Sequence, residues 1–525
     1  MTAPVAPANP GMVTLTIEGR TVIVPPGTNL IEAARTAGVL IPHYCYHPTL
    51  PVAGVCRMCL VEVEKFPKLT PACATSVGEG QVVHVHSPKA REARKGVLEF
   101  LLINHPLDCP ICDQSGECEL QDYTFAEGRK DSRYMEPKRF DPMEDFGGDV
   151  LYVPNRCILC TRCVRFMDVM VQDPVLNVSE RGDRAYIGKF EGSDLTHAWA
   201  SNVIDLCPVG ALLSKDFLNK ARAWELDRAA SICPGCSQGC NVILETRDNI
   251  VVRLRPRPNA AVNQHFACDV GRLNYRWINR RDRLEFPYVR TVAGLAATSW
   301  TEAFDAARAL IASASRVRLL VSPSLSNEAL FILGRIAAHV DAEMVMSVPR
   351  GSEVPLLGVK DLALRAERAA NHTGASLLGA TETDAPFDGL VAGDVLVIAD
   401  TNHSDGIIPD GVRVVMLASV LAAGVAAATA VALPICTFAE EDGTFTNLRG
   451  RVQRFLQART PPAQSRPSHR VAGELAAALG VGAFPVLAGD VFATMAQSVP
   501  AFAGLTYRGL GLQGALAAVP VEALV

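Results

Sequence analysis

The chain has 525 residues, too many for one hydrophobic core, so we expect roughly three to five folding units. Its 50 basic and 55 acidic residues give a formal charge of −5, which indicates neither a nucleic-acid partner nor electrostatic attachment to a membrane. Met1–Pro10 has neither the apolar run of a secretory signal nor the arginine-rich pattern of a transit peptide, so we expect a protein of the reducing cytoplasm.

Fifteen of the 16 cysteines lie between Cys45 and Cys268 in four spaced groups, and only Cys436 follows them. Disulfide frameworks are typical of small secreted chains, whereas C-x-x-C pairs in a long chain of cytosolic type indicate metal or redox chemistry. Four sites of four ligands need one ligand more than fifteen cysteines supply. Either one site is incomplete or one ligand is not a cysteine, and His105, just ahead of Cys109, is the candidate.

The first predicted elements are two strands and a helix, followed by a loop with cysteines. Alternating apolar residues predict a hairpin over residues 13–24, and a capped amphipathic pattern predicts a helix over Asn29–Ala37. The first group comprises Cys45, Cys56, Cys59 and Cys73. This order resembles the β-grasp fold of plant-type [2Fe-2S] ferredoxins, with a longer gap between the first two cysteines.

A second amphipathic helix is predicted over Lys89–Asn104, and Pro106 ends it. Its apolar stripe comprises Val97, Leu98, Leu101 and Leu102. The loop after it holds the second group, which comprises His105, Cys109, Cys112 and Cys118. A single histidine is most often structural, and that interpretation is favoured for His43, His47, His84 and His86.

The third group begins with the spacing of the bacterial ferredoxin run, in which a later cysteine followed by proline ligates another cluster. No cysteine follows at the usual distance, but Cys207-Pro208 appears downstream, and the simplest assignment adds Cys207. The third group therefore comprises Cys157, Cys160, Cys163 and Cys207. Positive charge from Arg156, Arg162 and Arg165 would offset the negative charge of an iron–sulfur cluster; the alternative is that these arginines are solvated at the surface.

The fourth group comprises Cys233, Cys236, Cys240 and Cys268. It brackets a hairpin predicted over residues 242–254. Zinc also binds four thiolates from C-x-x-C units, so this group alone favours zinc and an iron–sulfur cluster equally. The three neighbouring iron–sulfur candidates favour the cluster.

After Arg272 cysteine almost disappears and alanine and valine dominate. Helices are expected over 301–313 and 327–340, and buried strands over 316–321, 394–399 and 413–417. This alternation is typical of an α/β domain with a mostly parallel sheet. Val414–Pro434 is uncharged over about the length of a membrane span, but Gly424 interrupts it, so we expect two strands and an alanine-rich turn rather than a span.

Taken in order, the segments HYCYHPTLPVAGVCRMC, HPLDCPICDQSGECELQD, RCILCTRCVRF, CPVGAL and CPGCSQGC resemble the family of large G-type iron–sulfur subunits of bacterial respiratory complex I, NADH-quinone oxidoreductase. The resemblance is specific from Met12 to about Arg272. Beyond it, RLEFPYVR, NHTGASLLG and ALPICTFAEEDGTFTNLRGRVQ resemble more weakly the molybdopterin-oxidoreductase-like domain of that family.

The resemblance implies a multidomain α+β and α/β protein. The expected division is a β-grasp [2Fe-2S] ferredoxin-like domain over 1–95, a one-histidine [4Fe-4S] segment over 96–140, a [4Fe-4S] ferredoxin-like segment over 141–228, a four-cysteine [4Fe-4S] segment over 229–285, and a shortened, degenerate molybdopterin-oxidoreductase-like α/β domain over 286–525.

The resemblance also implies the cofactors. The first group would hold a [2Fe-2S] cluster, and the second, third and fourth groups would each hold a [4Fe-4S] cluster. The fourth cluster occurs only in some bacterial members, off the main electron path, which implies a bacterial source. No thiol lies between Cys268 and Cys436 to ligate molybdenum, so no molybdopterin is expected and Cys436 should pack as a small buried hydrophobe.

In this family the chain relays electrons from the flavin-bearing, NADH-oxidising subunits towards the quinone-reducing subunits and has no catalytic residue of its own. The resemblance thus implies a peripheral subunit of respiratory complex I on the cytoplasmic side of the bacterial inner membrane. The main alternative is the catalytic subunit of a molybdopterin-dependent formate dehydrogenase. An iron hydrogenase would need a cysteine-rich C-terminal domain, and a zinc-stapled protein would be colourless.

Overall fold

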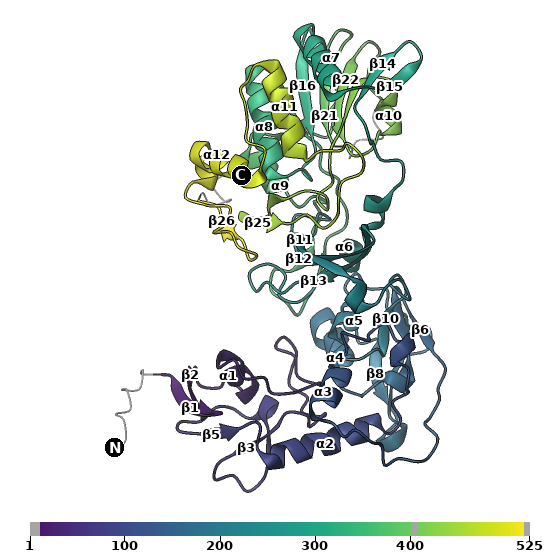
Figure 1. Cartoon of the computed structure of the whole chain (residues 1–525), viewed down its shortest axis with the longest axis vertical. Coiled ribbons are helices and arrows are strands. Elements are labelled where there is room, and N and C mark those ends of the chain that lie inside the picture. Colours follow the sequence, from purple (N-terminus) through teal and green to yellow (C-terminus); the bar gives the residue numbers. More distant parts are fainter. Residues whose placement is uncertain (1–10, 401–406, 519–525) are drawn as a thin grey trace. The chain divides into compact units, whose positions relative to one another are not determined.

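The computed structural model describes residues 11–400 and 407–518. Their backbone divides into two units (Figure 1). Unit 1 comprises the described residues up to Glu225 together with Leu356–Lys360, and unit 2 comprises Leu226–Pro355 and the described residues from Asp361 onward. Met1–Pro10, for which the sequence predicts no signal or transit peptide, lies outside the described residues.

Unit 1 begins with a five-stranded sheet and one helix. The elements are β1 (Val13–Ile17), β2 (Arg20–Val24), α1 (Leu30–Thr36), β3 (Leu60–Val63), β4 (Thr70–Pro71) and β5 (Val82–His84). The strand order is β2-β1-β5-β3-β4, with β1 and β5 parallel. The predicted hairpin and helix are confirmed, and the Asn29 side chain caps α1 by accepting from the Glu32 N–H at 3.0 Å.

Two helices follow, α2 (Pro88–Leu102) and α3 (Glu119–Glu127). The predicted stripe on α2 is only partly right, because its buried residues are Ala90, Arg94 and Leu98. Arg94 is fully buried, and its Nε lies 3.1 Å from Oε2 of Glu127 on α3. A buried arginine is tolerated when a carboxylate compensates its charge, and an apolar pattern cannot show such a residue.

The rest of unit 1 is built from short elements around the third group. They are β6 (Glu144–Gly147), β7 (Val150–Tyr152), α4 (Arg162–Arg165), β8 (Leu176–Ser179), β9 (Tyr186–Lys189), α5 (Asn202–Leu206) and β10 (Leu212–Ser214). A π-helix over Phe166–Val171 continues α4. Strands β7 and β10 pair antiparallel, which brings the chain before Cys157 beside the chain after Cys207.

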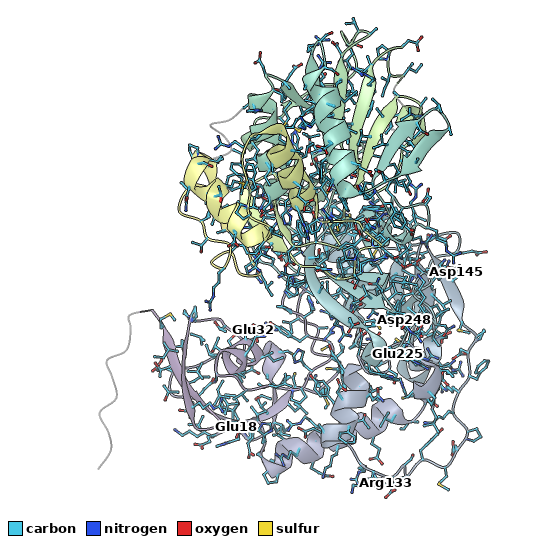
Figure 2. All side chains as sticks on the ribbon, turned by 45° about the horizontal axis from the view of Figure 1, so that its top comes forward. Glu18, Glu32, Arg133, Asp145, Glu225 and Asp248 are labelled. Carbon is cyan, nitrogen blue, oxygen red and sulfur yellow. The ribbon has the colours of Figure 1, made fainter. Side chains whose placement is uncertain are left out.

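Unit 2 begins with a three-stranded sheet made of β11 (Asp227–Ile232), β12 (Asn241–Arg247) and β13 (Ile250–Pro256), followed by α6 (Asp269–Leu273). The predicted hairpin is confirmed as β12 and β13, whereas β11 was not predicted. Asp248, labelled in Figure 2, and Asn249 form the turn with φ of 51° and 62°. Two successive positive φ values are typical of the tight turns that match strand twist, and Asp and Asn tolerate them.

The larger part of unit 2 is an α/β domain around an eight-stranded sheet. Its strands are β14 (Tyr288–Thr291), β15 (Gly294–Ala297), β16 (Val317–Val321), β17 (Glu343–Met346), β20 (Thr381–Glu382), β21 (Val395–Ala399), β22 (Arg413–Ala418) and β23 (Thr429–Pro434). The order is β15-β14-β23-β22-β21-β16-β17-β20, and the strands from β23 to β20 are parallel. The prediction of a mostly parallel sheet is confirmed.

Helices α7 (Trp300–Ala312), α8 (Asn327–His339), α11 (Ser468–Leu479) and α12 (Ala488–Ser498) share one apolar core with this sheet. Figure 1 shows α7, α8 and α11 beside β16, β21 and β22. Alternate strand residues such as Leu320, Ile398 and Met416 lie in a second core on the other face. Because both faces are covered, the strands are continuously apolar, as their sequences predict.

The uncharged stretch Val414–Pro434 forms most of β22, the short helix α10 (Ala423–Ala426) and β23, as expected. Across the described ranges, no helix combines the length and apolarity needed to cross a membrane. The remaining short elements of unit 2 are β18 (Val354–Pro355), β19 (Ala363–Leu364), α9 (His372–Leu377), β24 (Gly443–Thr446), β25 (Arg451–Phe455) and β26 (Ala515–Leu516).

Two buried glutamates make the stability of unit 2 depend on pH. Burial raises the pKa of Glu328 to about 7 and that of Glu441 to about 8, from an ordinary value of 4.5. At a pH between the ordinary and the raised pKa values, the folded protein retains protons that the unfolded chain has released. The contribution of these two groups to the free energy of unfolding therefore falls as pH rises from about 5 to about 8. Each group contributes up to roughly 1.4 kcal/mol per pH unit.

Thermal unfolding followed from pH 5 to pH 8 checks this expectation. The melting temperature of unit 2 should decrease over the range, and Glu441→Gln should reduce the decrease because glutamine does not titrate. Glu285→Gln, which replaces an exposed glutamate of the same unit, should leave the decrease unchanged. An equal decrease in Glu441→Gln and in the unaltered protein would show that Glu441 is not held protonated.

Candidate metal centres

The first group lies on the loop between α1 and β3, with its last cysteine just after β4. The Cys45 thiol is hydrogen-bonded to the thiols of Cys56 and Cys73, and Cys73 is hydrogen-bonded to Cys59. The Cys45 N–H also donates to Cys56 Sγ at 3.4 Å. The four thiols therefore form one connected set, and these hydrogen bonds lower the pKa of Cys45 and raise that of Cys73.

Helix α1 holds the start of this loop through a side chain. Glu32, labelled in Figure 2, accepts a hydrogen bond from the hydroxyl of Tyr46 at 2.9 Å, next to Cys45.

Two of the histidines for which a structural role is expected contact oxygen atoms of the protein. His43 Nδ1 lies 2.7 Å from the Ile41 carbonyl oxygen, and His84 Nε2 lies 3.0 Å from a carboxylate oxygen of Glu64. These contacts support the structural roles expected for both.

In the second group, His105 has a half-buried ring whose Nδ1 has no hydrogen-bond partner among the described residues. Burial, together with the charges of Lys138 and Arg156, lowers the pKa of His105 to about 4, so its imidazole is neutral at pH 7. A neutral imidazole with an unpaired nitrogen fits a metal ligand. Burial raises the pKa of Cys112, and the charge of Arg156 acts in the opposite direction.

The three thiols of the second group differ in exposure. Cys112 is buried, Cys118 is half-buried and Cys109 is exposed. Burial raises the pKa of Cys118 to about 11, and the charges of Cys112 and Cys109 act in the same direction, which places the three thiols within electrostatic range of one another.

A glycine joins the second group to the third. A Cβ added to Gly210, in the turn after Cys207, would lie 2.2 Å from Cys112 Sγ, so only glycine leaves room for this thiol. The Glu119 N–H, beside Cys118, also donates to the Pro208 carbonyl oxygen at 3.0 Å. The turn of the third group therefore packs directly on the second.

All four cysteines of the third group line one cavity. Apolar side chains such as Ile158, Ile187 and Leu212 line the same cavity. Burial raises the pKa of Cys157 and Cys207 to about 11 and that of Cys160 to about 12. A thiolate in such surroundings needs a compensating cation, so the cavity fits a group that brings positively charged iron to four sulfurs. The structure thus brings together the four residues that the sequence assigned to this group.

The fourth group lies wholly within unit 2. Its four cysteines are at most 7 % exposed, and the Cys233 N–H donates to the Cys240 carbonyl oxygen at 2.8 Å. Burial raises the pKa of Cys233 to about 12, with the charge of Cys236 acting in the same direction. A Cβ added to Gly271, on α6, would lie 2.8 Å from Cys233 Sγ and 3.4 Å from Cys268 Sγ. A glycine again leaves room for the sulfurs.

Within residues 11–400 and 407–518, no three His, Cys, Asp or Glu side chains are close enough to share a single metal ion. A cluster distributes its ligands over several irons, so its ligands need not lie that close together.

The sequence left two interpretations open for the arginines of the third group, and the surface interpretation is wrong for two of them. Arg156 is 7 % exposed and Arg162 is 5 % exposed. Arg156 donates to a carboxylate oxygen of Asp108 at 2.9 Å, beside Cys109.

The sequence analysis assigned no role to Gly210 or Gly271. Each lies three residues after a cysteine, and this spacing is the one local signal that could have pointed to them.

Five family models match consecutive parts of the chain. They are a 2Fe-2S iron-sulfur cluster binding domain over 11–88, the NADH-ubiquinone oxidoreductase-G iron-sulfur binding region over 94–133, the ferredoxin-like domain of NADH-quinone oxidoreductase subunit 3 over 147–213, the molybdopterin oxidoreductase Fe4S4 domain over 227–280, and molybdopterin oxidoreductase over 414–478. Each of the four ligand groups lies within one of the first four models. The expected fold class is confirmed, with 2Fe-2S and 4Fe-4S binding domains before a molybdopterin-oxidoreductase-like region.

Two curated relatives, both named as the G subunit of NADH-quinone oxidoreductase, show the same similarity. The protein of Rickettsia bellii is 41% identical over 324 residues, which are 61% of this chain and 47% of the relative. The protein of Streptomyces coelicolor is 40% identical over 331 residues, which are 62% of this chain and 39% of the relative. The chain therefore spans half or less of the length of these relatives.

Among solved structures, an NAD+-reducing [NiFe]-hydrogenase in its H2-reduced state is 29% identical, with a TM-score of 0.36, over 40% of this chain and 90% of that chain. Four cluster-binding models in one order and relatives about 40% identical show that about three fifths of this chain is similar to the G subunit of NADH-quinone oxidoreductase.

Proposed function

We propose that the chain is an electron-transfer subunit of an NADH-quinone oxidoreductase, relaying electrons from the NADH- and flavin-binding subunits towards the quinone-reducing subunits. The observation that carries the proposal is the joining of three ligand groups within unit 1. Gly210 packs the third group on the second, and Arg165 donates to the carbonyl oxygens of Cys45 and Cys160 at 2.6 and 3.2 Å, which ties the first group to the third. Adjacent sites are what a relay needs.

In this proposal the first group holds a [2Fe-2S] cluster. Cys45, Cys56, Cys59 and Cys73, whose thiols form one connected set, would hold this cluster. The second, third and fourth groups each hold a [4Fe-4S] cluster, and the Fe4S4 family model over 227–280 supports a cluster rather than zinc at the fourth. When bound, the clusters supply one-electron redox centres, and the chain's own residues hold them and keep water out.

The proposal includes the five-segment division with boundaries near residues 95, 140, 228 and 285. The regions matched by the family models begin or end near the same residues. It also places the protein as a peripheral subunit on the cytoplasmic side of a bacterial inner membrane, in contact with other subunits of respiratory complex I. No residue of this chain converts a substrate, and no molybdopterin takes part.

Affinity purification through a tag on this chain tests the proposal. Membranes of the host should yield a complex in which NADH reduces the iron–sulfur signals of the tagged chain and quinone reoxidises them. A chain whose signals respond to formate with an artificial dye, and not to NADH within its complex, would contradict the proposal.

Replacing the histidine ligand should change one reduction potential in a definite direction. A neutral imidazole leaves a cluster with less negative charge than a thiolate does, so His105→Cys should lower the reduction potential of the second cluster. Redox titration followed by electron paramagnetic resonance (EPR) measures this shift. His84→Cys, which replaces a histidine paired with Glu64, is the control and should change no cluster potential. A higher potential in His105→Cys would contradict the assignment of His105.

A further inference from the structure

Arg162 lies at the start of α4, between two cysteines of the third group. It is 5 % exposed and lines the same cavity as the four cysteines of that group. Its Nε is buried and has no hydrogen-bond partner among the residues that the structure describes. Leaving a buried N–H unpaired costs free energy, so this nitrogen is free to donate to an acceptor at the third site.

The two terminal nitrogens of Arg162 contact segments beside all three ligand groups of unit 1. Nη2 donates to the Tyr46 carbonyl oxygen at 2.9 Å, directly after Cys45. Nη1 donates to the Leu206 carbonyl oxygen at 3.2 Å, directly before Cys207. Both nitrogens reach the carboxylate of Glu119, directly after Cys118, at 3.4 and 3.5 Å.

These contacts distinguish Arg162 from its neighbours. Arg165 also joins the first and third groups, but it is only half-buried and does not line the cavity. Arg156 is buried, but its guanidinium is paired with Asp108. Arg162 alone among these three combines an unpaired buried N–H at the cavity with contacts to the segments of all three groups.

We propose that Arg162 is a positioning residue of the relay: its Nε–H donates to sulfur at the third site and its terminal nitrogens fix that site against the loops of the other two. This inference rests on the proposed function. Hydrogen bonds and positive charge near cluster sulfurs favour the reduced form, which carries one more negative charge. Arg162 therefore keeps the reduction potential of the third cluster above the value that its four thiolates alone would give.

Redox titration by EPR of the purified full chain tests this role in three variants. Arg162→Gln removes the charge and the Nε donor, and Arg162→Lys keeps the charge but not the planar donor. We expect the third cluster to become harder to reduce in Arg162→Gln, by a tenfold or larger fall in its reduction equilibrium, which equals about 59 mV for one electron. Arg162→Lys should show a smaller shift. Arg94→Gln removes an equally buried arginine paired with Glu127 and should leave this potential unchanged.

The signal of the third cluster is identified by its loss or change in Cys207→Ser. An unchanged potential in Arg162→Gln, or an equal shift in Arg94→Gln, would overturn the inference while leaving the relay proposal intact. A chain that binds no iron in any form would instead overturn the relay proposal.

A second measurement needs no variant and therefore covers the case in which Arg162→Gln fails to retain the third cluster. In the unaltered chain labelled with ¹⁵N-arginine, pulsed EPR of the reduced third cluster should detect an arginine nitrogen coupled through a hydrogen bond. Absence of any arginine nitrogen coupling at that cluster would overturn the inference.

Discussion

Replacing Cys160 by alanine should remove about four irons and four acid-labile sulfides from the purified chain, because a [4Fe-4S] cluster needs all of its thiolates. The cavity that Cys160 shares with the rest of the third group would then hold one ligand too few. The third group contacts the second through Gly210 and the first through Arg165. The variant complex should therefore also lose NADH-driven quinone reduction. Iron and sulfide analysis with EPR measures the first effect.

Cys436→Ala is the matched control for this change. Cys436 is only 4 % exposed and belongs to none of the four groups. Burial raises the pKa of its thiol. The control makes the same replacement of a buried cysteine, so it should retain iron and EPR signals and lose only a little stability. Equal iron loss in both variants would mean that the effect comes from general destabilisation and not from a missing ligand.

Gly210→Ala should disturb the second cluster even though it lies in the turn of the third group. The added Cβ would meet Cys112 Sγ at 2.2 Å and the Cβ of Gln114 at 3.1 Å, and neither distance is tolerable without movement of the loop. Displacement of Cys112 removes one of the expected ligands, so we predict loss or a changed line shape of the second-cluster EPR signal, with reduced iron content.

Gly96→Ala gives the control for a glycine replacement. Gly96 lies inside α2 with nothing within 4 Å of an added Cβ, so alanine should favour the helix by about 0.5–1 kcal/mol and leave every cluster signal unchanged. A Gly210→Ala chain with the full iron content and unaltered signals would show that the second group does not depend on the close approach of this turn.

Local patterns in the sequence predicted much of the fold because local physics decides those elements. The hairpin β1–β2, the capped helix α1 and the alternating elements of the α/β domain each follow from apolar periodicity, turn residues and caps within a few positions. The spacing of the cysteines likewise divided them into groups, and a long gap did not hide Cys207, whose three partners otherwise lacked a fourth ligand.

The features missed by the sequence depend on contacts between residues far apart in the chain. Arg94 interrupts the apolar face of α2 and is compensated by Glu127, which lies on another helix. The sequence placed the positive charge of Arg162 beside the third group but did not show its contact with Tyr46, 116 positions earlier in the chain. The need for glycine at position 210 comes from Cys112 on a different loop. No periodicity or spacing within one segment carries such information.

Quantification of iron, acid-labile sulfide, zinc and molybdenum, together with EPR of the reduced full chain, tests the central claim most directly. We predict one binuclear and three tetranuclear clusters and no molybdenum. A stoichiometric amount of molybdenum with formate–dye reductase activity, or a colourless protein with zinc in place of iron, would contradict the account.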